Sequence, residues 1–144
     1  MSEVSLSRFL DAQKRDYEIA LAEIKRGRKE SHWMWYIFPQ IQGLGRSSTA
    51  QFYSIKDRKE AEAYLNDSIL GNRLIEITEV VLNLDTNDAE KIFGWPDVMK
   101  LRSCMTLFAE VGQNDIFQKV LDKYYNGAKD GKTLKILSRD QSLL

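Results

Sequence analysis

The sequence is poor in the residues that usually build metal sites, disulfides and nucleophilic clusters. Its 144 residues include one cysteine, Cys104, and one histidine, His32. A single cysteine excludes a disulfide within the chain, and one residue of each kind excludes a multi-histidine or cysteine-cluster zinc site. We therefore expect no metal centre and no cofactor. The scarcity of cysteine also predicts a reducing, cytoplasmic setting.

Long hydrophobic runs and net charge are absent as well. The longest apolar run covers residues 33–38, far short of the roughly 20 residues that span a bilayer. Charged residues interrupt the first 16 positions, so the uninterrupted apolar stretch of roughly 7–15 residues that a signal peptide needs is missing there. The 21 basic residues balance the 21 acidic ones. Because non-specific nucleic-acid binding depends on neutralising phosphates, this balance predicts no nucleic acid as a partner. The short apolar run predicts no membrane.

Scarce proline and helical spacing of apolar residues predict helices. Apolar side chains recur at steps of three and four near residues 6–24, 60–65, 70–84, 98–108 and 117–124. A short turn is expected to end at Phe93, and a last short helix over residues 133–137 is expected to fray after Ser138. Only residues 52–55 resemble a strand. The sequence predicts a single all-α domain over residues 1–144, with about six helices, some of them short.

Capping residues are expected at the helix ends. Side chains that accept hydrogen bonds from free amides stand before the apolar segments, and glycines follow them. The expected caps are Ser5 or Ser7, Asp57, Asp67 and Asn114, with Gly27, Gly94 and Gly112 as terminators.

The densest group of uncommon side chains lies between residues 28 and 55. Four of the 15 aromatic residues fall within residues 33–38, next to the only histidine. At helical spacing, His32, Trp35 and Tyr36 share one face, while Trp33 and Ile37 share another. The face with Trp33 is expected in the core. The other face is expected to line a cleft, because tryptophan offers a broad stacking surface.

Polar groups suited to an anion follow the aromatic block. Amide groups such as that of Gln40 can read a polar ring edge, glycines let backbone amides approach a ligand, and Arg46 can pair with a phosphate. The sequence therefore predicts a pocket for a small molecule of the nucleotide or ADP-ribose-like class. The predicted binding residues are Trp35, Tyr36, Gln40, Gly43, Gly45, Ser47, Arg73 and Lys100, and in an enzyme His32 would be the general base and Arg46 the charge stabiliser.

Simpler interpretations exist for the same residues. The aromatic block can be core, the Gly-x-Gly a turn, and the basic run over residues 25–29 a solvated helix end. Cys104 on an apolar helix flank is expected to be inert. Alternatively, the aromatic residues form a surface that binds a partner protein without catalysis. A closed cavity of ligand size beside His32 would favour small-molecule binding. A flat, exposed aromatic patch would favour binding of a partner protein. If both tryptophans of the block are buried and Arg46 is exposed to water, the block is simply part of the core.

One glycine lies inside a predicted helix. Gly71 there costs about 1 kcal/mol relative to alanine, so close packing or a nearby ligand is expected to require it.

The sequence resembles a known family over almost its whole length. Residues 32–40, followed by residues 43–45 and Ser47, resemble the signature of the bacterial and fungal "domain of unknown function 1810" family. Further similarity lies at residues 12, 13, 17, 20, 21, 60, 61, 63–65, 70, 71, 73, 74, 92–94, 97, 100, 101, 103, 105–108, 120–122, 125, 127, 130, 133, 134 and 137. Two departures are residues 66–68, where proline is commoner, and Cys104, where serine is usual. The resemblance implies a compact, mostly helical protein and carries no assigned activity.

Overall fold

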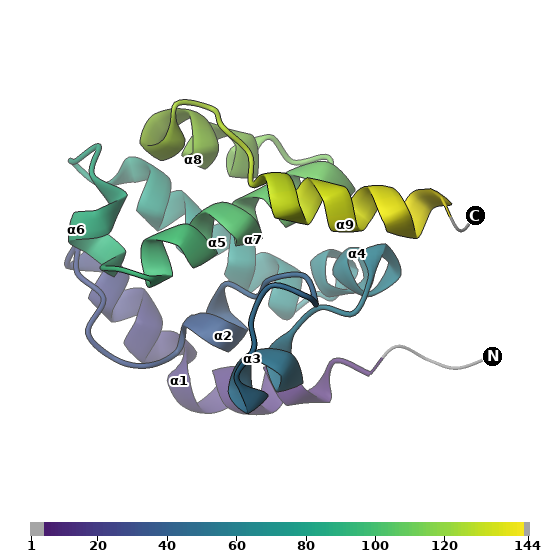
Figure 1. The fold of residues 1–144 in the computed structure, drawn as a ribbon. Coiled ribbons are helices and arrows are strands. Elements are labelled where there is room, and N and C mark those ends of the chain that lie inside the picture. Colours follow the sequence, from purple (N-terminus) through teal and green to yellow (C-terminus); the bar gives the residue numbers. More distant parts are fainter. Residues whose placement is uncertain (1–4, 143–144) are drawn as a thin grey trace.

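Every regular element between residues 5 and 142, the part of the chain that this computed structural model describes, is a helix (Figure 1). The helices are α1 (Ser7–Lys25), α2 (Met34–Ile37), α3 (Ser48–Tyr53), α4 (Arg58–Asn66), α5 (Leu70–Asn83), α6 (Ala89–Phe93), α7 (Asp97–Val111), α8 (Ile116–Tyr125) and α9 (Gly131–Ser142). The all-α class is therefore confirmed. The short helices α2, α3 and α6 raise the number above the expected six.

Short polar side chains begin several helices where the sequence indicated them. Asp57 starts α4 by accepting a hydrogen bond from the Glu60 amide at 2.8 Å. Asp67 accepts the Leu70 amide at 2.8 Å at the start of α5. The expected cap of α1 is wrong, because Ser5 and Ser7 contact each other and the helix begins without a side-chain cap.

The end of α1 is a Schellman motif at the expected glycine. Gly27 has a φ of +80°, which glycine adopts without strain. The amides of Gly27 and Arg28 donate to the carbonyls of Ile24 and Glu23 at 2.8 and 3.1 Å. This turn directs the chain away from α1 and toward the aromatic block.

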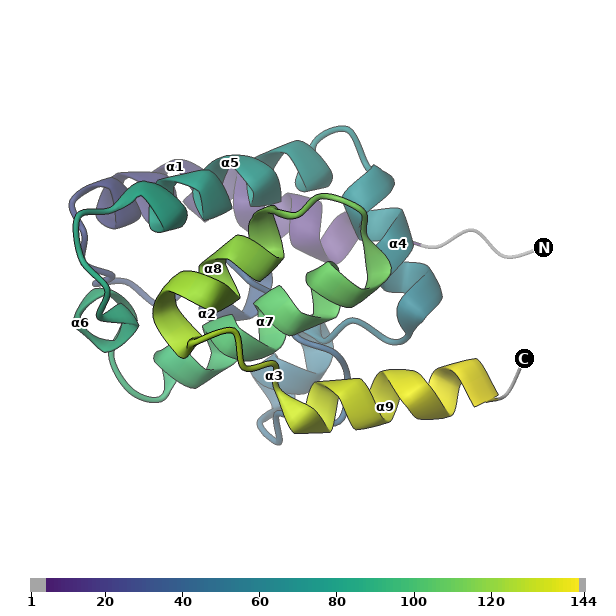
Figure 2. The ribbon, with the colours of Figure 1, turned by 90° about the horizontal axis from the view of Figure 1, so that it is seen from above.

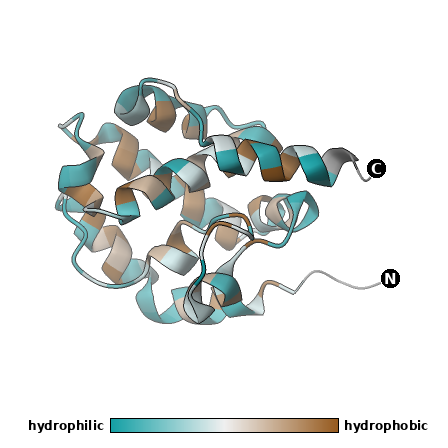
Figure 3. Cartoon of the chain, in the orientation of Figure 1, coloured by the Kyte–Doolittle hydropathy of each residue, from teal (hydrophilic) through white to brown (hydrophobic). Residues whose placement is uncertain are grey.

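Helix α7 lies at the centre of the fold. It packs against α4, α6, α8 and α9, while α5 packs against α1, α4 and α8. In Figure 2, α1 and α5 lie alongside each other on one side of α7, and α9 lies on the opposite side of α7. Apolar residues lie mostly on the inner sides of the helices (Figure 3). Within residues 5–142, no helix combines the length and apolar character needed to cross a membrane.

A chain of aromatic rings, packed edge-to-face or at a tilt, joins four helices through the core. The ring of Tyr64 lies 5.1 Å from Phe9 and 5.4 Å from Phe108, and Phe108 lies 5.8 Å from Phe117. These centroid distances fall in the favourable range for aromatic pairs. The rings tie α1, α4, α7 and α8 into one core.

The structure corrects two predictions of secondary structure. Residues 52 and 53 belong to α3 rather than to a strand, and Ile55 forms only an isolated parallel bridge with Ile41. Helix α9 continues to Ser142 rather than fraying after Ser138. Contacts distant in sequence explain the longer helix, because Leu137 is buried and the Asp140 carboxylate accepts the Arg58 amide at 2.9 Å.

Candidate functional site

The buried carboxylate of Glu23, near the end of α1, holds the segment that leads into α2. It is 4% exposed and accepts hydrogen bonds from the amides of Glu30 and Ser31, the Ser31 hydroxyl and the Trp33 indole, at 2.5–2.9 Å. Burial alone would raise the pKa of Glu23, but these hydrogen bonds outweigh it and lower the pKa to about 2. Ionised Glu23 thus acts as a brace: it holds in place the residues before and after His32, namely Ser31 and Trp33.

The aromatic block lies mostly in the core. Trp33 and Ile37 are buried, as expected. Tyr36 is buried too, with its hydroxyl donating to Asp16 and its ring 4.9 Å from that of Tyr53. The expectation that Tyr36 shares an open face with Trp35 is therefore wrong, because the ring fills the space between α1 and α3. Burial and the Asp16 carboxylate raise the pKa of Tyr36 to about 12.

Trp35 is the ring of this block that stays partly exposed, and one charged side chain, Lys100, lies over it. The ammonium of Lys100 lies 5.4 Å from the Trp35 ring centroid, within the range of a cation–π contact. Asp97 lies 3.6 Å from this ammonium and 2.8 Å from that of Lys29. Two positive charges therefore share one carboxylate, which leaves this surface with one net positive charge.

Lys29 is more deeply placed than the sequence indicated. Its side chain is 8% exposed, its ammonium lies 5.0 Å from the Trp33 ring centroid, and it donates to the Ser31 carbonyl at 2.6 Å. Arg26 pairs instead with the exposed Glu30 at 3.1 Å. The basic run over residues 25–29 therefore does not form one solvated cluster. The sequence singled out Lys100 but gave no signal that Lys29 and Asp97 would meet it.

The hollow beside Trp35 is small. Gln40 and Gly45 line it with Trp35, Ile41, Ala50, Tyr53 and Ser54, and its volume is about 10 Å³. That space holds one water at most, so no closed cavity of ligand size lies there. A Cβ at Gly45 would lie 2.5 Å from the Ala50 Cβ. The glycine therefore permits close approach of α3, which is a packing reason for its presence.

Other predicted residues make structural contacts around this hollow. Ser47 caps α3 by accepting the Ala50 amide at 3.1 Å. Gly43 has a φ of +108°, and a Cβ there would lie 3.2 Å from Ile136 of α9. Arg46 is exposed, and its carbonyl accepts the Gln51 side-chain amide.

His32 and Arg73 lie apart from these contacts. His32 is exposed, and among residues 5–142 its imidazole has no hydrogen-bond partner. Arg73 lies on α5 with its guanidinium 5.1 Å from the Tyr17 ring centroid, at the contact between α1 and α5. The structure thus brings Trp35 together with Gln40, Gly45 and Lys100. The roles predicted for His32, Arg46 and Arg73 stay predictions.

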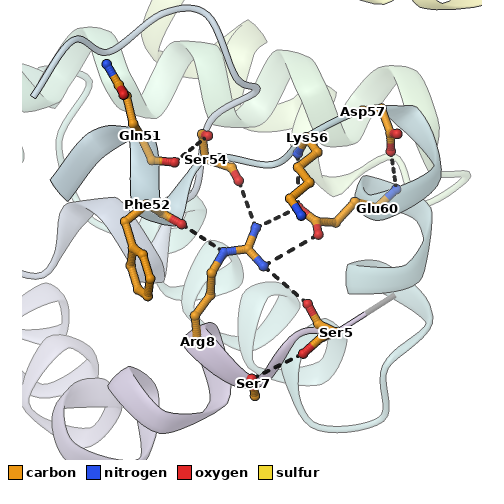
Figure 4. Close-up of polar contacts among 9 residues, drawn as sticks. All are labelled: Ser5, Ser7, Arg8, Gln51, Phe52, Ser54, Lys56, Asp57 and Glu60. Carbon is orange, nitrogen blue, oxygen red and sulfur yellow. Dashed lines mark hydrogen bonds and ion pairs between the residues drawn. The ribbon is translucent and has the colours of Figure 1, made fainter. Parts of the chain in front are cut away.

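A partly buried arginine joins α3 to the rest of the molecule (Figure 4). The Arg8 guanidinium donates to the carbonyls of Phe52 and Ser54 at 2.9 and 2.8 Å and pairs with Glu60 at 2.6 Å. The side chains of Arg8 and Glu60 are 14% and 5% exposed. Because α3 itself contributes no buried residue, this contact holds one wall of the Trp35 hollow. Nothing in the local sequence pattern indicated it.

Neither a nucleophilic cysteine nor a metal-binding cluster is found among residues 5–142 as a second candidate site. Cys104 is fully buried, and burial raises the pKa of its thiol, so the thiolate that a nucleophile needs is disfavoured. Within residues 5–142, no three side chains of His, Cys, Asp or Glu gather closely enough to hold a metal ion.

The chain is similar to proteins with no assigned activity. The family model described as "Protein of unknown function (DUF1810)" matches residues 3–137. The crystal structure of the conserved hypothetical protein Rv1873 from Mycobacterium tuberculosis is 45% identical in sequence, with a TM-score of 0.91. This similarity covers 92% of the present chain and 96% of that protein. A search of curated proteins finds no match.

Proposed function

The chain belongs to the DUF1810 family of proteins of unknown function, and we propose that it binds a phosphorylated small molecule with a planar ring. Nucleotides and ADP-ribose-like compounds are the favoured class. The binding surface is the Trp35–Lys100 face, formed by Lys29, Trp35, Asp97 and Lys100. One observation carries the proposal: an ammonium lies over a partly exposed indole, and two lysines share a single carboxylate there.

Both parts of such a ligand have a partner on this face. The Lys100 side chain is a point charge on a flexible stem, so it can swing from the indole to a phosphate. The ligand ring then takes the place of the ammonium on the Trp35 ring, where stacking is favourable. Asp97 keeps Lys29 in place during this exchange through the 2.8 Å ion pair.

The small hollow beside Trp35 supports a binding position outside the fold. A space of about 10 Å³ admits no ring, so the ligand lies on the outer face of Trp35 rather than inside the fold. Arg46, an exposed cation in the loop before α3, is proposed to supply a further positive charge for the phosphate. If a reaction follows binding, exposed His32 is the proposed general base, since an imidazole nitrogen can accept a proton.

Thermal melting with a panel of nucleotides, sugar phosphates and ADP-ribose derivatives tests the proposal. A ligand at about 100 times its Kd stabilises the protein by about 2.7 kcal/mol, a shift of several degrees. We expect such a shift in the wild-type protein, its loss in Lys100→Met, and a reduced shift in Arg46→Ala. Lys119→Met is the matched control, because Lys119 is an exposed lysine on α8 paired only with Asp115.

Two results of this experiment would contradict the proposal. One is a panel that leaves the wild-type melting temperature unchanged throughout. The other is a ligand that stabilises Lys100→Met as strongly as the wild type and Lys119→Met, which would place its binding site elsewhere.

A partner-binding surface is the second candidate function, favoured by one exposed residue. Trp95, in the turn before α7, is 72% exposed, and Met99, in the first turn of α7, is 38% exposed. Exposed tryptophan and methionine are typical of protein interfaces. Trp95→Ala would abolish binding of such a partner and leave any ligand-induced melting shift unchanged, which separates the two functions.

A further inference from the structure

A cleft of about 470 Å³ opens at the end of α7 that lies away from Lys100. It forms where α4 and α5 meet the connection between α7 and α8, a junction that can be followed in Figure 2. Lys100 stands in the first turn of α7 and Val111 ends it, so about 11 residues, or roughly 16 Å of helix, separate the two places. The volume falls within the roughly 300–1,000 Å³ of small-molecule sites.

The floor of the cleft is aliphatic and held by tight packing. Leu65, Ile75 and Val111 are partly buried there, and Phe117 lies fully buried beside them. A Cβ at Gly112 would lie 2.7 Å from the Leu65 Cδ1 and 3.0 Å from the Phe108 carbonyl oxygen, so the end of the Leu65 side chain would have to shift to admit it. Because Leu65, Ile75 and Val111 are only partly buried, the cleft leaves aliphatic groups open to solvent.

The rim of the cleft carries negative and neutral polar groups. Glu62 and Asn66 extend from α4, and Gln113 and Asn114 come from the α7–α8 connection. No lysine or arginine lines the cleft, and Glu62 forms no ion pair within residues 5–142. This lining disfavours a phosphate, so the cleft is chemically distinct from the Trp35–Lys100 face.

We propose that this cleft binds an organic cation, namely an apolar body that carries an ammonium group. The body would cover Leu65, Ile75 and Val111, where burial of apolar surface is favourable. The ammonium would pair with the Glu62 carboxylate, and amide oxygens of the rim would accept its remaining hydrogen bonds.

Three probes of equal chain length and different head group test the inference. We expect n-hexylamine to shift the backbone amide NMR signals of residues 62–66, 75 and 111–117 in a saturable way at pH 7. With n-hexanol the same signals should move less, and with n-hexanoate they should stay in place. Glu62→Gln should reduce the hexylamine effect to that of hexanol. Glu18→Gln, which neutralises an exposed carboxylate on α1, should leave the effect unchanged.

The remaining outcomes would overturn the inference. Equal shifts with all three probes would show an apolar groove without preference for a cation. Hexylamine shifts that persist in Glu62→Gln, or that spread over the surface instead of gathering at the cleft, would show that the Glu62 carboxylate does not select the ligand. Absence of any saturable shift would show that the cleft does not bind this class.

Discussion

The buried side chain of Glu23 determines the path of the backbone that leads to Trp35. Its carboxylate gathers donors from residues 30, 31 and 33, and so sets the path of the chain into α2. Because its pKa is lower in the folded protein than in the unfolded chain, ionised Glu23 stabilises the fold. This contribution is complete above the unfolded pKa of about 4.5 and is lost as the pH falls toward 2.

Glu23→Gln is therefore expected to destabilise the protein in a pH-dependent way. The difference between pKa values near 4.5 and 2 corresponds to roughly 3 kcal/mol at pH 7. Urea denaturation at pH 7, 4 and 2.5 measures the free energy of unfolding. The difference in this free energy between wild type and Glu23→Gln should become smaller at each lower pH. A gap that stays constant over this range would mean that Glu23 is not an ionised brace. Glu18→Gln, on the exposed side of α1, serves as the control with no gap expected.

Gly71 gives a second prediction about a single residue. A Cβ at this position would lie 2.0 Å from the Leu65 carbonyl oxygen, in the tight turn between α4 and α5. Backbone must move to admit it, so we expect Gly71→Ala to lower the free energy of unfolding by about 1–3 kcal/mol or more. Gly131→Ala is the matched change, because a Cβ there meets nothing within 4 Å. Thermal melting of both variants should separate them, and equal stability would contradict the packing explanation.

At the scale of elements, α3 depends on contacts made by other helices. It has no buried residue of its own, and the Arg8–Glu60 pair reaches it from α1 and α4 (Figure 4). Glu60 is buried and Arg8 is 14% exposed, so removing Arg8 leaves a buried carboxylate without its partner charge, which costs more than losing an exposed pair.

Arg8→Met is expected to destabilise the protein by roughly 3 kcal/mol and to loosen α3. Hydrogen exchange should become faster for the amides of residues 48–53, while the core of α7 changes only with global stability. Arg26→Met removes an exposed pair with Glu30 and should cost no more than about 0.5 kcal/mol. Unchanged exchange in α3 after Arg8→Met would contradict the anchoring role.

The elements differ in how far the sequence could predict them. Helices such as α4, with Asp57 as its cap and Ala61 and Tyr64 inside, follow from local spacing and local hydrogen bonds. The length of α9 does not, because Asp140 and Leu137 obtain their partners from distant segments. Gly71 was predictable in part. Its position inside a helix indicated close packing or a nearby ligand, but only the structure identifies the Leu65 carbonyl as the group that it packs against.

At the scale of the whole molecule, the candidate site forms where distant segments meet. Lys29 follows α1, Trp35 lies on α2, and Lys100 lies on α7, so no local pattern could predict their contact. Helical spacing indicated Trp33 as core and Trp35 as the more open ring, but it placed Tyr36 on the wrong face. The high structural similarity to Rv1873 shows that this arrangement of helices is shared with a protein 45% identical in sequence.

The indole N–H signals of the three tryptophans test the central claim most directly. Trp33 donates to Glu23 in the core, Trp35 lies under Lys100, and Trp95 is exposed, so each signal reports on a different place. Trp→Phe variants assign the signals, and the protein is then titrated with each member of the nucleotide and ADP-ribose panel. We predict that a phosphorylated ring compound moves the Trp35 signal and leaves those of Trp33 and Trp95 in place. A Trp35 signal that stays still with every compound, or a bound compound that moves only Trp95, would contradict the account.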